Sequence, residues 1–299
     1  MRFRAAGALT LCLAALCLTA ACVTGESGTA GGPLPVTLEA GPEVGGLSGI
    51  EVSDNGAHFT AISDRGLLVQ GDLLRQGGRL TGARVTSFAP LRLPEGRAMP
   101  AEGLDTEGLA RMPDGGLAVS LELHPEVWIY PPDGGAPRAL PPPPDAPVLG
   151  INGMYEALAV DPEGRLVTLP EVPLGGGSHH SLWRLEAGQW REVAILASDD
   201  GFRPVGADFA SDGTLYLLER AFGRGFRNRL VRLDPEAPDL APVTVWATSA
   251  SRATNYEGVS IWTDAQGRDR AVLVSDDNFM RLLNQSLLEI PLDPGGTSR

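Results

Sequence analysis

Short hydrophobic runs recur along the chain, and a polar turn ending in Gly separates each run from the next. In a typical unit, a strand of small residues leads into the turn, and an apolar second strand follows and ends in a carboxylate. Turns such as Asp54-Asn55-Gly56 and Ser211-Asp212-Gly213 have the residue types of β-hairpins. No segment shows a helical period over ten or more residues. The pattern therefore predicts an all-β chain.

Five such units follow one another. In several of them a third strand follows, such as Ser181–Leu185, and a weaker fourth strand is present at Arg191–Leu196. Four strands repeated in tandem, with starts about 50 residues apart, are typical of a β-propeller. We therefore expect a propeller of four-stranded blades and favour five of them. The five leading strands begin at Ser48, Glu107, Glu156, Val205 and Glu257.

Two segments bear on how the ring closes. The last unit lacks a fourth strand, and Leu34–Glu39 is a spare strand before the first unit. If that spare strand completes the last blade, two exposed sheet edges disappear. The alternative to five blades is a sixth, irregular blade within Gly66–Pro100.

The N-terminal segment predicts export. Arg2 and Arg4 precede an apolar run, and small residues precede Cys22; the apolar run is too short for a confident transmembrane span. We predict a signal peptide at 1–21, a flexible tether at 22–35, the propeller domain at 36–293 and a loose tail at 294–299. All three cysteines lie at or before Cys22, so the mature domain has no disulfide.

Residues 18–22 (LTAAC) resemble the lipobox of bacterial lipoproteins, although Thr19 stands where Leu is usual. This resemblance implies lipidation of Cys22 and a place in the cell envelope, facing the periplasm or the exterior. The alternative is an ordinary signal peptide cut near Ala21, with Cys22 incidental.

The charge of the chain limits its partners. A net charge of −13 repels nucleic-acid phosphates, so nucleic acid is not an expected partner. We expect a monomer that meets a small-molecule substrate and touches the membrane only through its lipid.

Carboxylates recur at two positions of the repeat. Glu107, Glu156 and Glu257 share one position in the leading strands that line a propeller channel, with Ser48 and Val205 as the equivalents. The second position closes the following strand and is occupied by Asp64, Glu122, Glu171, Glu219 and Asp276. Converging carboxylates raise one another's pKa unless arginines, shared protons or a cation offset them.

Oxygen ligands without Cys or clustered His favour Ca²⁺, with Mg²⁺ as the alternative. The competing interpretation is structural: the acids cap strand ends or pair with neighbouring arginines, as in Asp64-Arg65 and Glu219-Arg220. Asn255 and Tyr256, which precede Glu257, could orient it or touch a ligand, or could only pack and cap.

Six short motifs, taken in order, resemble those of the phytase-like family, also called "esterase-like activity of phytase". The motifs are Gly46–Gly49, Ile62–Arg65, Glu107–Ala110, Leu218–Arg220, Asn255–Gly258 and Val274–Phe279. The resemblance spans about Val44–Ile290. It implies metal-dependent hydrolysis of a phosphate ester. On this basis we assign catalysis to Glu107, Glu156 and Glu257, metal binding to Asp64, Glu122, Glu171 and Asp276, and substrate binding to Arg65, Arg220, Asn255 and Tyr256.

Two other functions stay open at this stage. The first is a metal-dependent lactonase or carboxylic esterase. The second is a non-enzymatic propeller that binds a small molecule, a glycan or an envelope partner, because one fold can host many functions.

Overall fold

A computed structural model describes residues 33–100, 105–122, 125–146, 154–173, 177–199, 201–237, 240–251, 254–279 and 285–292. All of them belong to one compact unit, Pro33–Arg299. The predicted signal peptide, Cys22, most of the tether and the tail lie outside the described residues, and the domain boundaries 36 and 293 stay predictions. No helix within the described ranges has the length and apolar character needed to cross a membrane.

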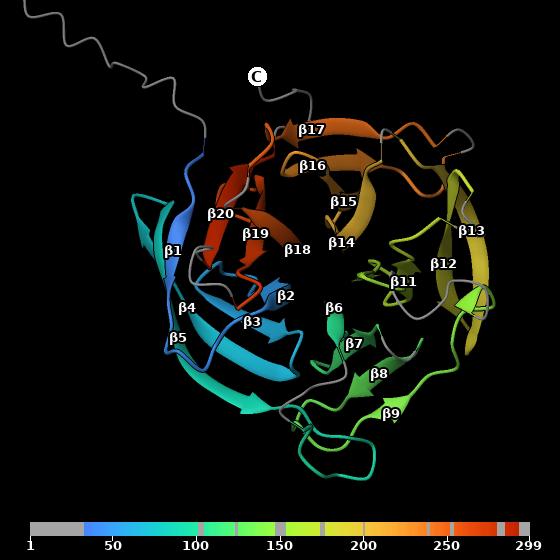
Figure 1. Cartoon of the computed structure of the whole chain (residues 1–299), viewed down its shortest axis with the longest axis horizontal. Coiled ribbons are helices and arrows are strands. Elements are labelled where there is room, and N and C mark those ends of the chain that lie inside the picture. Colours follow the sequence, from blue (N-terminus) through green and yellow to red (C-terminus); the bar gives the residue numbers. More distant parts are fainter. Residues whose placement is uncertain are drawn as a thin grey trace, which may run out of the picture. The chain divides into compact units, whose positions relative to one another are not determined.

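The described part of the chain forms an all-β ring of five four-stranded blades (Figure 1). Blade 1 contains β2 (Leu47–Val52), β3 (His58–Ser63), β4 (Leu67–Gln76) and β5 (Arg79–Pro90). Blade 2 contains β6 (Thr106–Arg111), β7 (Leu117–Leu121), β8 (Val127–Tyr130) and β9 (Arg138–Ala139). Blade 3 contains β10 (Ala157–Val160), β11 (Leu166–Leu169), β12 (His179–Glu186) and β13 (Gln189–Ala197).

Blade 4 contains β14 (Arg203–Phe209), β15 (Leu215–Phe222), β16 (Phe226–Leu233) and β17 (Val243–Ala247). Blade 5 contains β18 (Asn255–Thr263), β19 (Asp269–Asp276), β20 (Ser286–Pro291) and β1 (Val36–Glu39). The predicted propeller of four-stranded blades is confirmed, and the favoured number of five is the one observed.

Strand β1 is the spare strand of the sequence, and it closes the ring as predicted. It pairs antiparallel with β20, where Val36 faces Leu287, and parallel with β5, where Leu38 faces Ala83. One short strand therefore joins the last blade to the first. The segment 66–100 supplies β4 and β5 of blade 1, so it forms no separate blade within the described residues.

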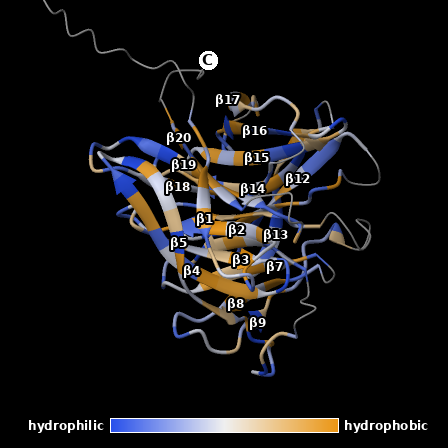
Figure 2. Cartoon of the chain, turned by 60° about the vertical axis from the view of Figure 1, so that its left-hand side comes forward, coloured by the Kyte–Doolittle hydropathy of each residue, from blue (hydrophilic) through white to orange (hydrophobic). Residues whose placement is uncertain are grey.

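Aliphatic side chains between neighbouring blades form the core. One cluster joins Leu47 and Ile50 of blade 1 to Val274 and Leu287 of blade 5. Stretches of hydrophobic colour run along strands such as β4 in Figure 2. Each blade covers the hydrophobic face of the next, and this burial stabilises the ring by about 25 cal/mol per Å² of apolar surface.

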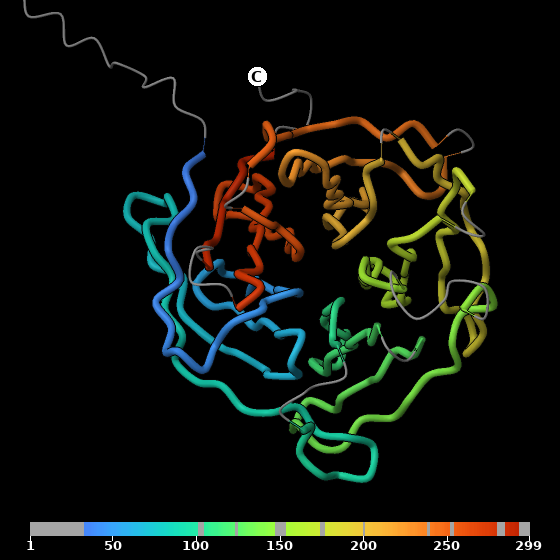
Figure 3. Tube along the Cα trace, viewed as in Figure 1, coloured from blue at the N-terminus to red at the C-terminus, as the bar shows by residue number. Residues whose placement is uncertain are grey.

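The innermost strands β2, β6, β10, β14 and β18 contact one another in a closed circle, which the trace in Figure 3 shows around the channel. Glycines permit the close approach. A Cβ on Gly108 would lie 2.6 Å from the carbonyl oxygen of Glu156, and a Cβ on Gly206 would lie 2.7 Å from that of Glu257. A Cβ on Gly258 would likewise lie 2.9 Å from the carbonyl oxygen of Ser48.

The residue before each of these glycines sits at a β-bulge. The pairing register shifts between Thr106 and Leu109 in blade 2, and between Tyr256 and Gly258 in blade 5. Blades 1 and 4 have the same shift at Leu47/Gly49 and Pro204/Gly206. A bulge leaves one residue unpaired and re-aims its side chain.

Side chains three residues beyond the bulge connect neighbouring inner strands. Each accepts a hydrogen bond from a backbone N–H of the next blade, which satisfies a donor that the bulged edge strand would leave open. The bonds run from Arg111 N to Glu51 Oε1 (2.9 Å), from Ile261 N to Asp208 Oδ2 (2.5 Å) and from Val52 N to Ser260 Oγ (2.9 Å).

Replacing Gly108 by Ala should destabilise the domain by about 1–3 kcal/mol, because the added Cβ would overlap the Glu156 carbonyl oxygen. The midpoint of urea unfolding checks this. Gly82→Ala is the control, since its Cβ would meet Leu74 at an ordinary 3.4 Å. Equal midpoints for the two variants would contradict the role given to Gly108.

Candidate functional site

A cavity of about 400 Å³ lies where the inner strands begin and the second strands end. It brings together all three predicted catalytic residues and all four predicted metal ligands. The described residues that line it are Asp64, Asp105, Glu107, Glu122, Glu156, Glu171, Val172, Arg203, Arg220, Glu257, Asp276 and Asn278.

The bulged position supplies the first group of acids. Glu107 and Glu257 occupy it in β6 and β18, and Glu156 directly precedes β10. The other two blades use the position differently. Ser48 is buried and its hydroxyl donates to the Thr106 carbonyl oxygen at 2.6 Å, while Val205 is buried in the core. Three blades therefore direct a carboxylate into the cavity from this position.

The second group lies where β3, β7, β11 and β19 end. Asp276 is the register partner of Asn255, and the equivalent pair in blade 4 is Arg203 with Arg220. The position that holds a carboxylate in the other blades therefore holds Arg220 in blade 4. The alignment that placed Glu219 in this group is wrong by one residue.

A shift of one residue turns a side chain to the opposite face of a strand. Glu219 accordingly faces away from the cavity and pairs with Arg229 at 2.5 Å. Burial raises the pKa of Glu219, and the bond from Arg229 opposes that rise. Aligning blade 4 on Gly206, which follows the bulge, would have found the correct position.

Arg220 is the central counter-charge. Its guanidinium pairs with Glu257, contacts Glu171 at 3.2 Å and approaches Glu156 to 3.9 Å. It also donates to Asn255 Oδ1 at 3.1 Å. Burial disfavours the charged form of Arg220, but the surrounding carboxylates together have a larger opposite effect, so the pKa of Arg220 is raised.

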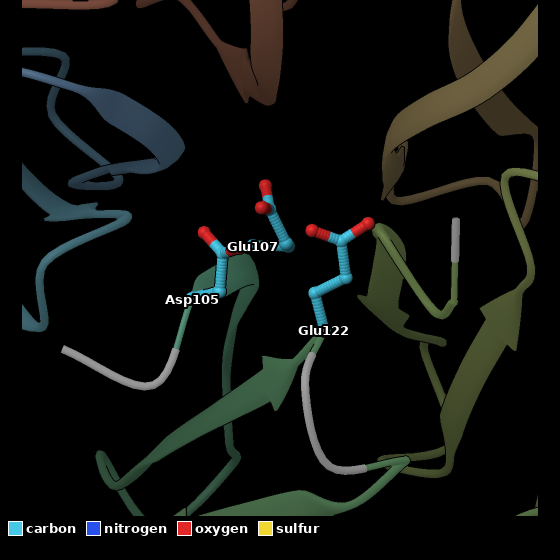
Figure 4. A group of neighbouring side chains, drawn as sticks. All are labelled: Asp105, Glu107 and Glu122. Atoms are coloured by element: carbon cyan, nitrogen blue, oxygen red, sulfur yellow. The ribbon is translucent and has the colours of Figure 1, made fainter. Parts of the chain in front are cut away.

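Asp105, Glu107 and Glu122 form a carboxylate cluster in blade 2. One oxygen from each lies within 4.8 Å of the others. Figure 4 shows the three groups turned toward the same region, from the start of β6 and the end of β7. Asp105 has a positive φ of 56°, which few non-glycine residues adopt. Sequence reasoning missed Asp105, since it precedes the repeated strand pattern.

Burial and like charge disfavour the ionised forms of Glu107, Asp64 and Asp276 in the cavity. Burial first, and then Glu156 and Glu257, raise the pKa of Glu107 well above its ordinary value. Burial and Asp105 raise the pKa of Asp64 to about 7. Burial and Glu257 raise the pKa of Asp276 to about 7. Ionising these groups together therefore costs free energy that a bound cation would offset.

The structure places only some of the predicted substrate-binding residues at the cavity. Arg220 lines the cavity, and Asn255 supports it by donating to Glu257 at 2.7 Å. The Arg65 guanidinium carbon lies 3.3 Å from the centre of the Phe279 ring, and Arg65 is not among the described lining residues. Tyr256 is buried in the core against Trp246. Arg203, which the sequence did not single out, lines the cavity.

The donor set fits a hard divalent cation. Its ligand atoms are carboxylate oxygens, which Ca²⁺ and Mg²⁺ prefer. A second observation agrees: Asp64 Oδ1 is buried, lines the same cavity and has no hydrogen-bond partner in the described structure. The acidic cluster could therefore hold a metal ion.

A family model described as "Phytase-like: Esterase-like activity of phytase" matches residues 42–279, well over half of the chain. Comparison with curated proteins gave no significant match.

The chain is also similar to several solved structures. Virginiamycin B lyase from Staphylococcus aureus is 14% identical over 89% of this chain and 75% of its own, with a TM-score of 0.42. A gluconolactonase from Xanthomonas campestris is 12% identical over 82% and 72%, with a TM-score of 0.46. The PQQ-bound aldose sugar dehydrogenase from Streptomyces coelicolor is 17% identical over 86% and 81%, with a TM-score of 0.41. Likenesses of this strength carry no argument about function.

Without divalent cations, the melting temperature should fall as the pH rises from 5 to 8. Asp64 and Asp276 have an ordinary pKa of 3.8 that folding raises to about 7. The folded state therefore binds more protons over this range, and its stability is lost as the pH rises through the folded pKa. Calorimetry of chelated protein checks this. The fall should be smaller in Asp276→Asn, and a melting temperature that rises with pH would contradict it.

Replacing Arg220 by Met should lower the free energy of unfolding by about 3–5 kcal/mol at pH 8, because buried carboxylates lose their counter-charge. The loss should shrink at pH 5, because burial raises the pKa of Glu156 and Glu257 and a lower pH favours their neutral forms. Urea unfolding at both pH values measures it. Arg84→Met breaks only an exposed pair with Asp72 and should cost under about 1 kcal/mol. An equal loss at pH 5 and pH 8 would contradict the role of Arg220.

Proposed function

This chain belongs to the phytase-like family, and from that premise we propose that it is a hydrolase that cleaves a phosphate ester with the help of Ca²⁺ or Mg²⁺. The observation that carries the proposal is the cluster of Asp105, Glu107 and Glu122, which faces arginines across the same cavity. A cation site beside arginine suits a substrate with a negatively charged phosphoryl group.

The carboxylate cluster of blade 2 would hold the cation, with Asp64 close by. When bound, the cation supplies polarisation of a phosphoryl oxygen and a lowered pKa for a water molecule. Glu107 thus changes from the acid/base role first assigned to it to that of a ligand, because it belongs to the cluster.

Glu156 has the properties of a general acid. Burial first, and then Glu171, raise its pKa well above the ordinary value, against the opposing charge of Arg220. A carboxyl group whose pKa is raised holds its proton more strongly and can donate it to the leaving-group oxygen of an ester. Glu257 is held by Arg220 and Asn255, so we assign it to positioning that arginine.

Arg203 is better suited than Arg220 to receive a phosphate group. Its side chain is 48% exposed and contacts Glu171 at 3.5 Å. Its guanidinium can turn toward an oxyanion with little loss, whereas Arg220 is already engaged by several acids.

The proposal includes an exported protein attached to the membrane through a lipid on Cys22 and facing the periplasm or the exterior. It rests on the charged, apolar and small-residue segments before Cys22. Mass spectrometry of the mature protein would detect the lipid, and an unmodified N-terminus after Ala21 would overturn this part.

Chelated protein should be inactive on p-nitrophenyl phosphate and recover with Ca²⁺ or Mg²⁺. With phenyl phosphate, whose phenolate leaving group needs a proton, Glu156→Gln should lower kcat by about 10²–10⁴ because the proton donor is lost, with cation affinity unchanged. Glu107→Gln should weaken cation binding in titration calorimetry. Glu163→Gln, at an exposed position outside the cavity, is the matched control and should change neither.

The same experiment tests the other functions. Cleavage of a lactone or a carboxylic ester, with none of p-nitrophenyl phosphate, would replace the proposal by the lactonase or esterase alternative. Full activity in Glu107→Gln and Glu156→Gln together would remove both residues from the mechanism. No cleavage and no cation binding would favour the ligand-binding propeller.

A further inference from the structure

Phe222, which is exposed, and Phe226, which is partly buried, form an aromatic pair on the hairpin that joins β15 to β16. The Phe222 side chain is 76% exposed, and its ring centre lies 5.1 Å from that of Phe226. The Phe222 ring leaves most of its apolar surface in contact with water. Such a pair therefore offers contact area to a ligand.

The pair lies beside the cavity. Phe222 follows Arg220 by two residues on β15, so both side chains are on the same face of the strand, about 7 Å apart along it. Phe226 is the register partner of Phe222 on β16. The aromatic pair thus continues the wall of blade 4 outward from Arg220, which lines the cavity.

The hairpin is held in place. Phe226 N donates to Ser251 O at 2.7 Å, and Ser251 N donates back to Phe226 O at 2.9 Å. A Cβ on Gly225 would lie 2.7 Å from Ser251 O, so only glycine permits this approach. A surface fixed in this way loses little conformational entropy when it binds a ligand.

Arginines lie on the other face of the same hairpin. Phe202 stacks against Arg229 at 4.2 Å and Arg227 at 4.9 Å, and Arg203 follows it into the cavity wall. Blade 4 therefore contributes aromatic and positive groups to a site whose other blades contribute carboxylates.

The polar lining of the cavity does not suit an apolar group. Val172 is the one apolar side chain among the described residues that line it, and the carboxylates there would lose hydration against a hydrocarbon. The organic part of an ester substrate must therefore lie outside the cavity. The aromatic pair is an apolar surface about 7 Å along β15 from Arg220.

We propose that Phe222 and Phe226 bind the organic group of the substrate, so that the enzyme selects phosphate esters of aryl or similarly flat apolar alcohols. The inference rests on the proposed function, because it takes the phosphoryl group to lie in the cavity. Phe222 acts on specificity, through the alcohol part of the ester, and takes no part in the chemical step.

The test compares phenyl phosphate with methyl phosphate in the presence of Ca²⁺. Phe222→Ala should raise KM for phenyl phosphate about three- to tenfold, which corresponds to one lost aromatic contact. It should leave kcat, and KM for methyl phosphate, unchanged. Phe222→Tyr, which keeps an aromatic ring at this position, should have the low wild-type KM for phenyl phosphate. Phe88→Ala, which removes a 45% exposed ring on β5 of blade 1, should have no effect.

Binding of phenylphosphonate and methylphosphonate, which are not cleaved, separates this inference from the proposed function. A preference for phenylphosphonate that Phe222→Ala removes supports the inference even without turnover. Cleavage of both phosphates with equal KM in the wild type and in Phe222→Ala overturns the inference and leaves the proposed function standing. If Phe222→Ala leaves KM unchanged but abolishes binding to vesicles of anionic lipid, the aromatic pair contacts the membrane instead. That result also overturns the inference.

Discussion

The close approach of neighbouring inner strands is the constraint on which the rest of the molecule depends. Where β6 meets blade 3, the backbone at Gly108 lies so near the Glu156 carbonyl oxygen that no Cβ fits between them. Gly206 and Gly258 meet the next blade in the same way. The ring can be this narrow because each strand bulges at the residue before the glycine, and the bulge directs Glu107 and Glu257 into the channel.

A narrow channel lined by carboxylates then requires positive charge. Arg220 supplies part of it, since one guanidinium contacts acids from blades 3 and 5. In blade 2, burial first, and then the carboxylates of Glu156 and Glu257, disfavour the charged form of Glu107. Asp105, Glu107 and Glu122 of blade 2 could hold a metal ion, while blade 4 contributes Arg203 and Arg220 to the same cavity.

Blade 4 differs from the other blades throughout, and this difference gives the site its polarity. Val205 replaces the bulged glutamate, Arg220 replaces the second carboxylate, and the hairpin beyond them is aromatic and basic. A ring of five similar blades thereby acquires a cavity with carboxylates from blades 1, 2, 3 and 5 and arginines from blade 4, without any change in fold.

The sequence by itself determined the all-β class, the five repeats, the closing strand and the seven repeated acids that meet in the cavity, because these follow from local periodicity and turn chemistry. Only the tertiary structure decided that Arg220 and not Glu219 faces the channel, since register in a strand depends on a bulge made with its partner. It likewise brought Asp105 and Arg203 into the site and Tyr256 into the core. Those placements depend on contacts between blades, which no local pattern of residues contains.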